Sequence, residues 1–597
     1  MFSLACIIHK KMTDRTNASS VPGAAGMEGP SDKLFRCRWV RNKVPMAHRE
    51  ELYQILRMTG PLLLARILHY LLPFVVTMFC GRLGNDVMAG YGLASATLNV
   101  TSAATGFGLA LACDTLVSQT FGGRNLLRVG VILQRGILIL LLFCLPCWGL
   151  LINAQAILLC LGQDPVVARI AQLYITAYLP AVPAMYLHHL QVSYLQNQGI
   201  IMPQMYAAAL ANIANVATNY IFIYWLDLGV VGSAAANTLS QVYICVFLFG
   251  YIWWKKLHTT TWGGWSVESL QEWGSYMKLA IPSTLMTCFE WWVYEFGGFF
   301  AGMLSEEELA AQHAVIMVAF LTYMFPLGIQ AAACARVGNA LGAGDTARAI
   351  LSSKLSLALA GCFAIVEGLV LGSTKSVIGF ISHQSWFFDG LVCVCTGIFL
   401  GTGKQKIPAV AHLIGYYCIG LPLCVTLMFV AKLRILGFWL GLLICVILQS
   451  TFYIVVIFKL NWEKMTEEAV KRAQKNTRLA LLDADTLLDN TGTNTSRASN
   501  NGNSVEGYVP VTTENNDGKL EVSDRRAVPE QRRERLSSSQ LILRRGFTVF
   551  AALGLLGVGI IVHFLVPLPE TQFTKANTTE GWINTTYAPS QYFSTVQ

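Results

Sequence analysis

The stretch Cys288-Phe-Glu-Trp-Trp-Val-Tyr-Glu-Phe-Gly297 places two glutamates, Glu290 and Glu295, inside an apolar segment that spans residues 278–304. A carboxylate at the centre of a bilayer costs about 2.5 to 3.5 kcal/mol even on lenient insertion scales, so an acid in such a segment marks a functional site. On a helix these two glutamates lie roughly 140° apart and about 7.5 Å apart along the axis, so they need not share a face. The alternative is that one or both serve packing alone, protonated or hydrogen-bonded to neighbouring helices.

The composition of the 597-residue chain is typical of a membrane protein, since 54% of the residues are hydrophobic and only 13% are charged. A soluble domain carries about 25% charged residues. In a membrane protein, the positions of Lys and Arg indicate which side of the membrane each loop faces. The chain has a net charge of +9 but no patch that combines basic and aromatic residues, so nucleic-acid binding is not indicated. The 16 cysteines show neither a disulfide framework nor a zinc spacing, so no metal or cofactor is expected.

Apolar segments of helical length recur along the whole chain between short polar connections. Six lie near residues 58–81, 88–118, 129–152, 166–196, 204–226 and 230–254, and six more near 278–304, 309–335, 349–372, 386–401, 407–430 and 435–458. Runs this long must satisfy their backbone within the segment in lipid, which favours helices. With a last run at 547–566, the sequence predicts an all-α membrane protein with two six-helix lobes and a thirteenth C-terminal transmembrane helix.

The segments and connections divide the chain into seven regions. These are a cytoplasmic N-terminal arm (1–50), an N-lobe (51–254), a cytoplasmic connection (255–277), a C-lobe (278–460), a disordered cytoplasmic linker (461–545), the thirteenth helix (546–568) and an extracellular tail (569–597). Lys and Arg concentrate in the connections after the second, sixth, eighth and tenth segments, which the positive-inside rule places in the cytoplasm. Two glycosylation sequons, at Asn577 and Asn584, agree with an extracellular tail.

The two halves of the chain repeat each other. Gly60-Pro61 and the apolar run after it align with Ile281-Pro282, and Gln119-Thr-Phe-Gly122 aligns with Asn339-Ala-Leu-Gly342. Both copies hold six segments and so begin on the same side of the membrane, which makes the repeat parallel. A cavity between the two copies is the expected binding site.

The second copy is about 15 residues shorter than the first around Ser382 to Phe388. Its tenth segment, Trp386 to Gly401, would reach only about 24 Å, against a hydrocarbon core of about 30 Å. We therefore expect the tenth helix to be short, strained or incomplete.

Several longer motifs occur together in this chain. They are Pro73-Phe-Val, Phe79-Cys-Gly81, Gly106-Phe-Gly-Leu, Ala112-Cys-Asp-Thr-Leu116, Gln119-Thr-Phe-Gly122, Gly130-Val-Ile-Leu-Gln-Arg135, Trp262-Gly-Gly-Trp-Ser266, Glu290-Trp-Trp-Val-Tyr-Glu295 and Arg336-Val-Gly-Asn-Ala-Leu-Gly-Ala-Gly-Asp345. With them the chain resembles the multidrug and toxin extrusion (MATE) family, specifically its vertebrate branch, over residues 52–460 and in its thirteenth helix. The resemblance implies two six-helix lobes in a V, alternating access, and export of small organic cations in exchange for protons. The expected location is the plasma membrane, with its apical face as a candidate.

The resemblance also implies which acids couple the export of cations to the entry of protons. It places them at Glu290 and Glu295 in the seventh helix and at Asp389 in the tenth, where vertebrate relatives usually carry Glu. Where those relatives have a further acid in the eighth helix, this chain has Met317. That departure and the short tenth helix leave an alternative, a non-transporting or impaired isoform.

The residues themselves support such coupling, because a buried carboxylate binds either a proton or a cation and the two compete. Trp291, Trp292 and Tyr294 interleave the acids, and aromatic faces attract organic cations by about 0.5 to 2 kcal/mol each. They are therefore candidates to line the substrate cavity. Aromatic residues are equally common at contacts between helices, which is the packing alternative.

Two polar residues of the first half are further candidates for the cavity. Asp114 lies toward the cytoplasmic end of the second helix, where capping nearby backbone or pairing with Arg124 is as reasonable as a transport role. His69 occupies the repeat position of Glu290 and would supply a titratable group at matching depth, although packing is the favoured interpretation. A structural role is also favoured for the remaining candidates, His188, His189 and Glu367.

Other classes of function find little support in the sequence. Gly342-Ala-Gly344 lacks the spacing of a phosphate-binding loop, so no nucleotide is expected. No constellation of catalytic residues lies outside the membrane segments, which argues against an enzyme. The expected partners are organic cations, protons and the lipid bilayer. Two alternatives of the same architecture remain, a sodium-coupled exporter and a lipid-linked flippase, whose cavity would carry cationic residues for phosphate.

Overall fold

The computed structural model describes residues 44–371, 377–474 and 537–566, and within these ranges the regular structure is entirely helical. Eight of these helices are long and apolar enough to cross a bilayer. A ninth span results if α9 (Pro165–Tyr178) and α10 (Ala181–Gln196), which meet at an angle of 57°, count as one. The all-helical membrane class is confirmed, while the arrangement as two six-helix lobes and a thirteenth helix stays a prediction.

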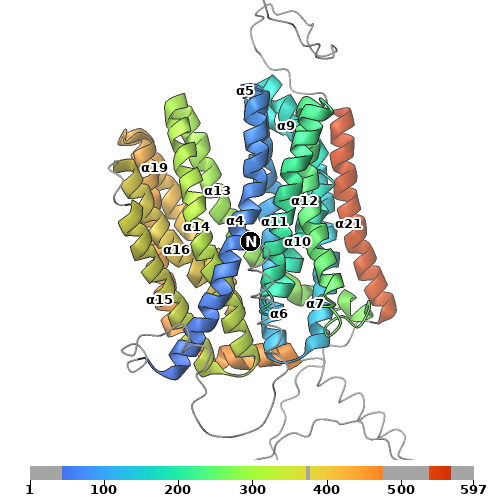
Figure 1. The fold of residues 1–597 in the computed structure, drawn as a ribbon, viewed down its shortest axis with the longest axis vertical. Coiled ribbons are helices and arrows are strands. Elements are labelled where there is room, and N and C mark those ends of the chain that lie inside the picture. Colours follow the sequence, from blue (N-terminus) through green and yellow to red (C-terminus); the bar gives the residue numbers. More distant parts are fainter. Residues whose placement is uncertain (1–43, 372–376, 475–536, 567–597) are drawn as a thin grey trace, which may run out of the picture.

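The helices stand in two groups that diverge toward one end of the molecule (Figure 1). Besides α9 and α10, the first group holds α4 (Met46–Leu83), α5 (Asn85–Leu98), η1 (Asn99–Ala103), α6 (Ala104–Gly122), α7 (Leu126–Leu151), α8 (Ala154–Cys160), α11 (Met202–Tyr220), η2 (Ile221–Trp225) and α12 (Gly229–Trp254). The second holds α13 (Trp273–Leu304), α14 (Glu306–Gly342), α15 (Thr346–Leu371), α16 (Val377–Thr402), α17 (Lys406–His412), η4 (Leu413–Gly420), α18 (Leu421–Val425), η5 (Thr426–Val430) and α19 (Arg434–Lys459). The short helix η3 (Val267–Leu270) lies in the connection between them.

The backbone repeats itself at positions that the sequence repeat relates. The π-helical turn η2 corresponds in register to the π-helical turn η5. Just after these turns, Asp227 and Lys432 both adopt left-handed backbone, with φ of 49° and 56°. Because non-glycine residues rarely take this conformation, its recurrence is a structural trace of the repeat.

The prediction of a short tenth helix is wrong. The helix α16 runs from Val377 to Thr402 and has 26 residues, which at 1.5 Å per residue gives about 39 Å. The hydropathy pattern ends at the polar stretch 382–385, but the helical backbone continues through it. In the first half of the chain, the helix α8 and a turn lie between α7 and α9. In the second half, only residues 372–376, which lie outside the described part, separate α15 from α16.

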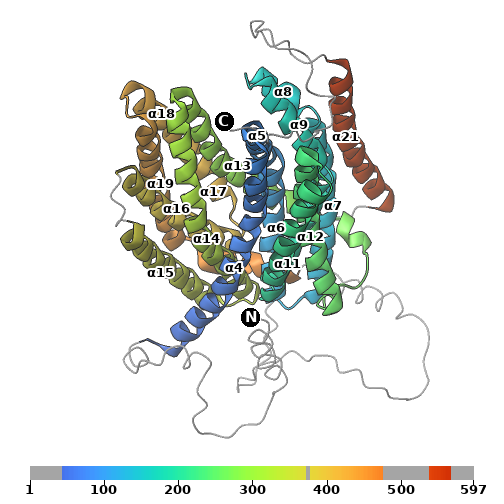
Figure 2. The ribbon, with the colours of Figure 1, turned by 45° about the horizontal axis from the view of Figure 1, so that its top comes forward.

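The helix α4 belongs to both groups, since it packs on α11 and α12 and also on α14 and α15. It contains Pro61 and Pro73, and a proline inside a helix removes a backbone hydrogen bond and bends it. Figures 1 and 2 show its N-terminal half leaning toward α15. There the buried carboxylate of Glu51 accepts hydrogen bonds from Arg336 at 2.8 and 2.6 Å and pairs with Arg348 at 3.1 Å. These charges tie α4 to the second group.

At the same end the two groups meet through α6 and α14. A Cβ on Gly122 would overlap the backbone of Asn339, and a Cβ on Gly342 would overlap the backbone of Gln119. The glycines of the two aligned motifs therefore allow the close approach of the two helices, which any larger residue would prevent.

The stretch 461–545 was expected to be disordered throughout, and this is wrong at both ends. Residues 462–474 form a helix that lies across the lower end of both groups in Figure 1. Met465, Ala469 and Ala473 are buried on one face of it, which is the spacing of an amphipathic helix. Its Arg472 donates to Gln119 at 3.0 Å.

The last helix, α21 (Ser538–Leu565), begins before the predicted start at residue 546 and packs on α7 at the edge of the first group (Figure 1). Gly149 and Gly559 lie at the contact, and Asn153 donates to the carbonyl of Gly559 at 2.8 Å. At the other end of the chain, α4 begins at Met46, within the region expected to be an N-terminal arm.

Candidate functional site

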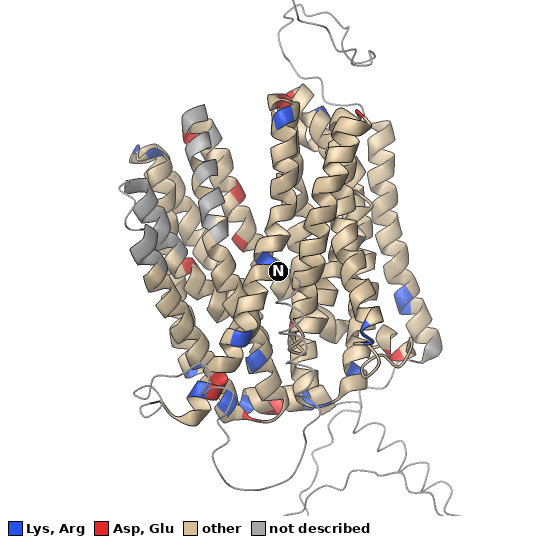
Figure 3. Cartoon of the chain, in the orientation of Figure 1, with Lys and Arg blue, Asp and Glu red and all other residues tan. Residues whose placement is uncertain are grey.

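Glu290 lies on α13 and is held from α14. The hydroxyl of Tyr323 donates a hydrogen bond to Oε1 of Glu290 at 2.6 Å. Figure 3 shows acidic positions on α13 well away from the ends of the helix, where most of the other charges gather. The sequence predicted this acid, but its partner Tyr323 is 33 residues away and was not predicted.

Asp389 lies on α16 and accepts hydrogen bonds from two tyrosines. Tyr294 donates to its Oδ2 at 3.0 Å, and Tyr416 of η4 donates to its Oδ1 at 3.1 Å. The side chain of Asp389 is buried, with 1% of its surface exposed. Tyr294, a predicted cavity residue, thus positions a carboxylate, and Tyr416 is a site residue that the sequence analysis missed.

Glu290 and Asp389 are linked through Tyr294, which lies one helical turn after Glu290 on α13 and donates its hydrogen bond to Asp389. The fold therefore brings together one acid from α13 and one from α16, with hydroxyl donors from α13, α14 and η4 around them. Two carboxyl groups at such a site repel each other when both are ionised, so the pair favours binding of a proton or of a cation.

Glu295, the third predicted coupling acid, stands apart from this pair. Its side chain is exposed, while Glu290 is half-buried and Asp389 is buried. The angular separation expected from helix geometry explains the difference, because the two glutamates face different sides of α13.

The two tryptophans between the glutamates reach across to the first group. Trp291 stacks on Phe107 of α6, with ring centroids 5.8 Å apart and an interplanar angle of 20°. Trp292 donates its indole N–H to the carbonyl of Val100 at 3.1 Å. Trp291 therefore presents an aromatic face at the boundary of the two groups, while Trp292 holds α13 against η1.

Asp114 lies on α6 and is bound by side chains at the end of α10. Its Oδ1 accepts hydrogen bonds from Ser193 at 2.7 Å, from Gln196 at 3.0 Å and from Asn197 at 2.5 Å. Within the described residues Asp114 forms no pair with Arg124, which was one expectation for it. Asp114 thus fixes α6 to α10 and also faces a pocket.

That pocket contains a charged residue which the sequence analysis overlooked, Arg66 of α4. The pocket has a volume of about 10 Å³ and is lined by Arg66, Phe107, Ala110, Leu111, Asp114, His189, Val192, Ser193 and Gln196. The guanidinium of Arg66 lies 6.0 Å from the ring centroid of Phe107. Arg66 stands within an apolar run, so the criterion that singled out Glu290 would have found it as well.

His69 belongs to a cluster of histidines next to this pocket. It stacks on His188 with ring centroids 5.4 Å apart, and His189 lies 6.5 Å from it. His189 also meets Phe107 edge to face at 5.4 Å. His69 thus lies against two other histidines next to the pocket rather than at the acids, and its role stays a prediction.

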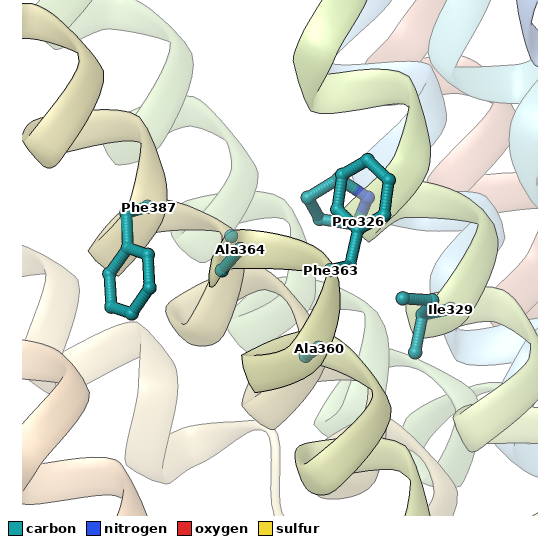
Figure 4. Close-up of a pocket in the computed structure, with 7 residues that line it drawn as sticks. Pro326, Ile329, Ala360, Phe363, Ala364 and Phe387 are labelled. Carbon is teal, nitrogen blue, oxygen red and sulfur yellow. The ribbon is translucent and has the colours of Figure 1, made fainter. Parts of the chain in front are cut away.

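A second pocket lies between α14, α15 and α16, as Figure 4 shows, and its lining is entirely apolar. It consists of Pro326, Ile329, Ala360, Phe363, Ala364, Phe387 and Gly390. Such a lining offers no ligand for a cation, so the candidate site stays with the acids and the first pocket. The side chains of Met317 and Glu367, both raised by the sequence, lie outside the described part.

Long apolar helices that enclose paired carboxylates, tyrosine hydroxyls and an arginine define a class of protein. Charged groups at such depth occur in membrane proteins that move ions or solutes, and they lie between helix groups rather than facing lipid. Fold and site together define a multi-pass helical membrane transport protein.

Comparison with known proteins narrows this class to one family. The family model MatE matches residues 61–221 and 282–385. Multidrug and toxin extrusion protein 1 of Danio rerio is 45% identical over 547 residues, covering 88% of this chain and 92% of that protein. Its Homo sapiens namesake is 42% identical over 575 residues, covering 91% and 98%. The structure of the eukaryotic MATE transporter AtDTX14 matches with a TM-score of 0.68 at 26% identity, covering 72% of this chain and 100% of that one. The chain belongs to the multidrug and toxin extrusion family, as its motifs predicted, and is a transport protein rather than an enzyme.

Proposed function

We propose that this protein exports small organic cations in exchange for protons, by alternating access between two six-helix lobes. The observation that carries the proposal is that α13 places Glu290 one turn from Tyr294, whose hydroxyl donates to Asp389, among the aromatic residues of the same helix. The names of the relatives, multidrug and toxin extrusion proteins, support export of xenobiotics.

The exchange follows from competition at the paired acids. A cation that arrives from the cytoplasm is held by the carboxylates and by the face of Trp291, and it displaces the proton. Protons that arrive from outside neutralise the acids and release the cation. Both ligands use the same carboxyl groups, so each cycle exchanges one for the other.

The observed conformation corresponds to one state of this cycle. The groups are closed against each other where Gly122 and Gly342 meet, and they diverge toward the opposite end (Figure 1). We place the closed end and the N-terminus on the cytoplasmic side. We place the protein in the plasma membrane, with the apical membrane as the candidate location. The C-terminal tail is then extracellular, and glycosylation at Asn577 or Asn584 would report it.

The full length of α16 bears on the alternative of an impaired isoform. That alternative rested on Met317 in place of an acid and on a tenth helix too short to span, and the second of these grounds falls away because the helix has 26 residues. A sodium-coupled exporter remains the competing function, since the coupling ion of transporters built from such repeats is either sodium or a proton. The experiment must therefore separate the two coupling ions.

The test is uptake of a radiolabelled quaternary ammonium into vesicles with an acidic interior. We expect uptake that collapses when an ionophore dissipates the proton gradient, and no uptake in Glu290→Gln, which keeps the shape and removes the titration. Glu463→Gln is the matched control, because this glutamate is exposed on the helix 462–474. Full uptake in Glu290→Gln, or uptake driven only by a sodium gradient, would contradict the proposal.

A further inference from the structure

His412 is a buried polar residue of the second helix group that lies close to the acids. It is the last residue of α17 and is fully buried. Its Nδ1 atom lies 3.1 Å from the backbone carbonyl of Met286 on α13. Because a carbonyl oxygen only accepts hydrogen bonds, the ring carries a proton on Nδ1 and donates it to Met286.

The carbonyl that accepts this hydrogen bond belongs to the turn of α13 that precedes Glu290. In an α-helix the carbonyl of residue 286 also accepts from the backbone N–H of residue 290, and its two lone pairs serve both donors. His412 therefore fixes the backbone one turn before Glu290. One turn after Glu290, Tyr294 is fixed by its hydrogen bond to Asp389. Glu290 thus lies between two points at which α13 is tied to neighbouring helices.

Both of these ties lead to the same carboxylate. The ring of His412 meets the ring of Tyr416 edge to face, with centroids 5.2 Å apart, and Tyr416 donates to Asp389 at 3.1 Å. Tyr416 lies four residues after His412, in the π-helical segment η4. The contacts form a closed loop that leaves α13 at Met286, passes through these three residues and returns to α13 at Tyr294. Loss of one contact would free α13 and η4 to shift relative to each other.

We propose that His412 is a positioning residue of the exchange, which holds Glu290 and Asp389 in a fixed geometry through its hydrogen bond to α13. It acts through the backbone of Met286 and the ring of Tyr416 rather than by contact with the cation. Its other ring nitrogen, Nε2, is buried and has no hydrogen-bond partner among the described residues, so the bond from Nδ1 carries this role. The inference rests on the proposed exchange of organic cations for protons at these acids.

The alternative is that His412 only fills space. Its ring also stacks on that of Tyr453, with centroids 6.0 Å apart, and a buried ring contributes to packing whether or not it donates. The two roles make opposite demands on a substitute. Asparagine carries an amide N–H donor at the position of Nδ1 but lacks the ring, whereas phenylalanine keeps the ring and lacks the donor.

The experiment measures the initial rate of proton-driven quaternary ammonium uptake in His412→Asn and His412→Phe. His412→Asn should stay within about twofold of the wild type because it keeps the donor, although the lost ring lowers its melting temperature. His412→Phe should transport about fivefold more slowly, because Met286 loses a hydrogen bond that positions the acids. His563→Phe is the matched control, since His563 is exposed on α21. Detergent-solubilised yield and melting temperature verify that each variant is folded.

A double variant tests the loop of contacts. His412→Phe combined with Tyr416→Phe should be little slower than Tyr416→Phe alone, because contacts that act as a unit give non-additive effects. A folded His412→Phe that transports at the wild-type rate would overturn the proposal. A His412→Asn no faster than His412→Phe, or fully additive losses in the double variant, would overturn it as well. A wild type without proton-driven uptake would contradict the proposed function instead.

Discussion

Tyr294 donates a hydrogen bond to Asp389 at 3.0 Å, although it lies only one helical turn from Glu290 on the same helix. The helix α13 thus contributes both an acid of its own and the hydroxyl that positions the acid of α16. Movement of α13 relative to α16 would change the environment of both carboxyl groups at once, which is a requirement for coupling two ligands to one conformational change.

Replacing Tyr294 by Phe should lower the rate of proton-driven cation uptake about tenfold, because a hydrogen bond to a charged group contributes about 1.5 to 3 kcal/mol. Initial rates of quaternary ammonium uptake provide the measurement. Tyr417→Phe is the matched control, because the hydroxyl of Tyr417 is buried without a partner among the described residues. Equal rates in Tyr294→Phe and the wild type would show that the contact has no role in exchange.

The pairing of acids predicts how two substitutions combine. Glu290→Gln and Asp389→Asn should each remove pH-dependent exchange, and the double variant should be about as inactive as the single variants, because residues that act as a unit give non-additive effects. Glu295→Gln should reduce exchange less, since Glu295 is exposed and stands outside the pair. Rates of proton-driven uptake in all four variants test this. Independent, additive losses from Glu290 and Asp389 would argue against a shared site.

The charged residues of this site were predictable from the sequence, whereas the tyrosines that bind them were not. Glu290 stands in a long apolar run, where the cost of burying a charge identifies it without any knowledge of contacts. Arg66 carries the same signal and was overlooked. Tyr323 and Tyr416 carry none, because a tyrosine in an apolar helix is ordinary and only the tertiary fold brings it to a carboxylate.

For the fold, the sequence predicted that most helices exist but not where all of them begin and end. Long apolar runs predicted the helices, but hydropathy misjudged the limits of α16, because the polar stretch 382–385 continues a helix that it was expected to end. The helix 462–474 was missed for a related reason. Its buried face consists of small or isolated apolar residues within a polar stretch, and it forms because the lower ends of both groups provide a surface to cover.

The contact between α6 and α14 predicts a strong effect of one methyl group. Gly342→Ala should lower the melting temperature and destabilise the closed lower end, because overpacking of this kind costs about 1 to 3 kcal/mol. Thermal unfolding in detergent is the measurement. Gly361→Ala on α15 is the matched control, since a Cβ there meets open space and Ala favours the helix. An unchanged melting temperature in Gly342→Ala would mean that the two helices can separate at no cost.

The last helix should be dispensable for transport. Only 6% of the apolar window of α21 is buried; the helix packs on α7 near Gly149, and its Arg545 donates to the carbonyl of Leu270 and lies over the ring of Trp273, at the start of α13 and away from the acid pair. A chain that ends after Leu543 should therefore take up quaternary ammonium at close to the full rate, with a modest loss of thermal stability from the missing contact. Gly559→Leu in the full chain provides the matched test, because it disrupts the docking of α21 and leaves the helix present. Loss of transport in a truncated chain that still reaches the membrane would give α21 a part in the transport cycle.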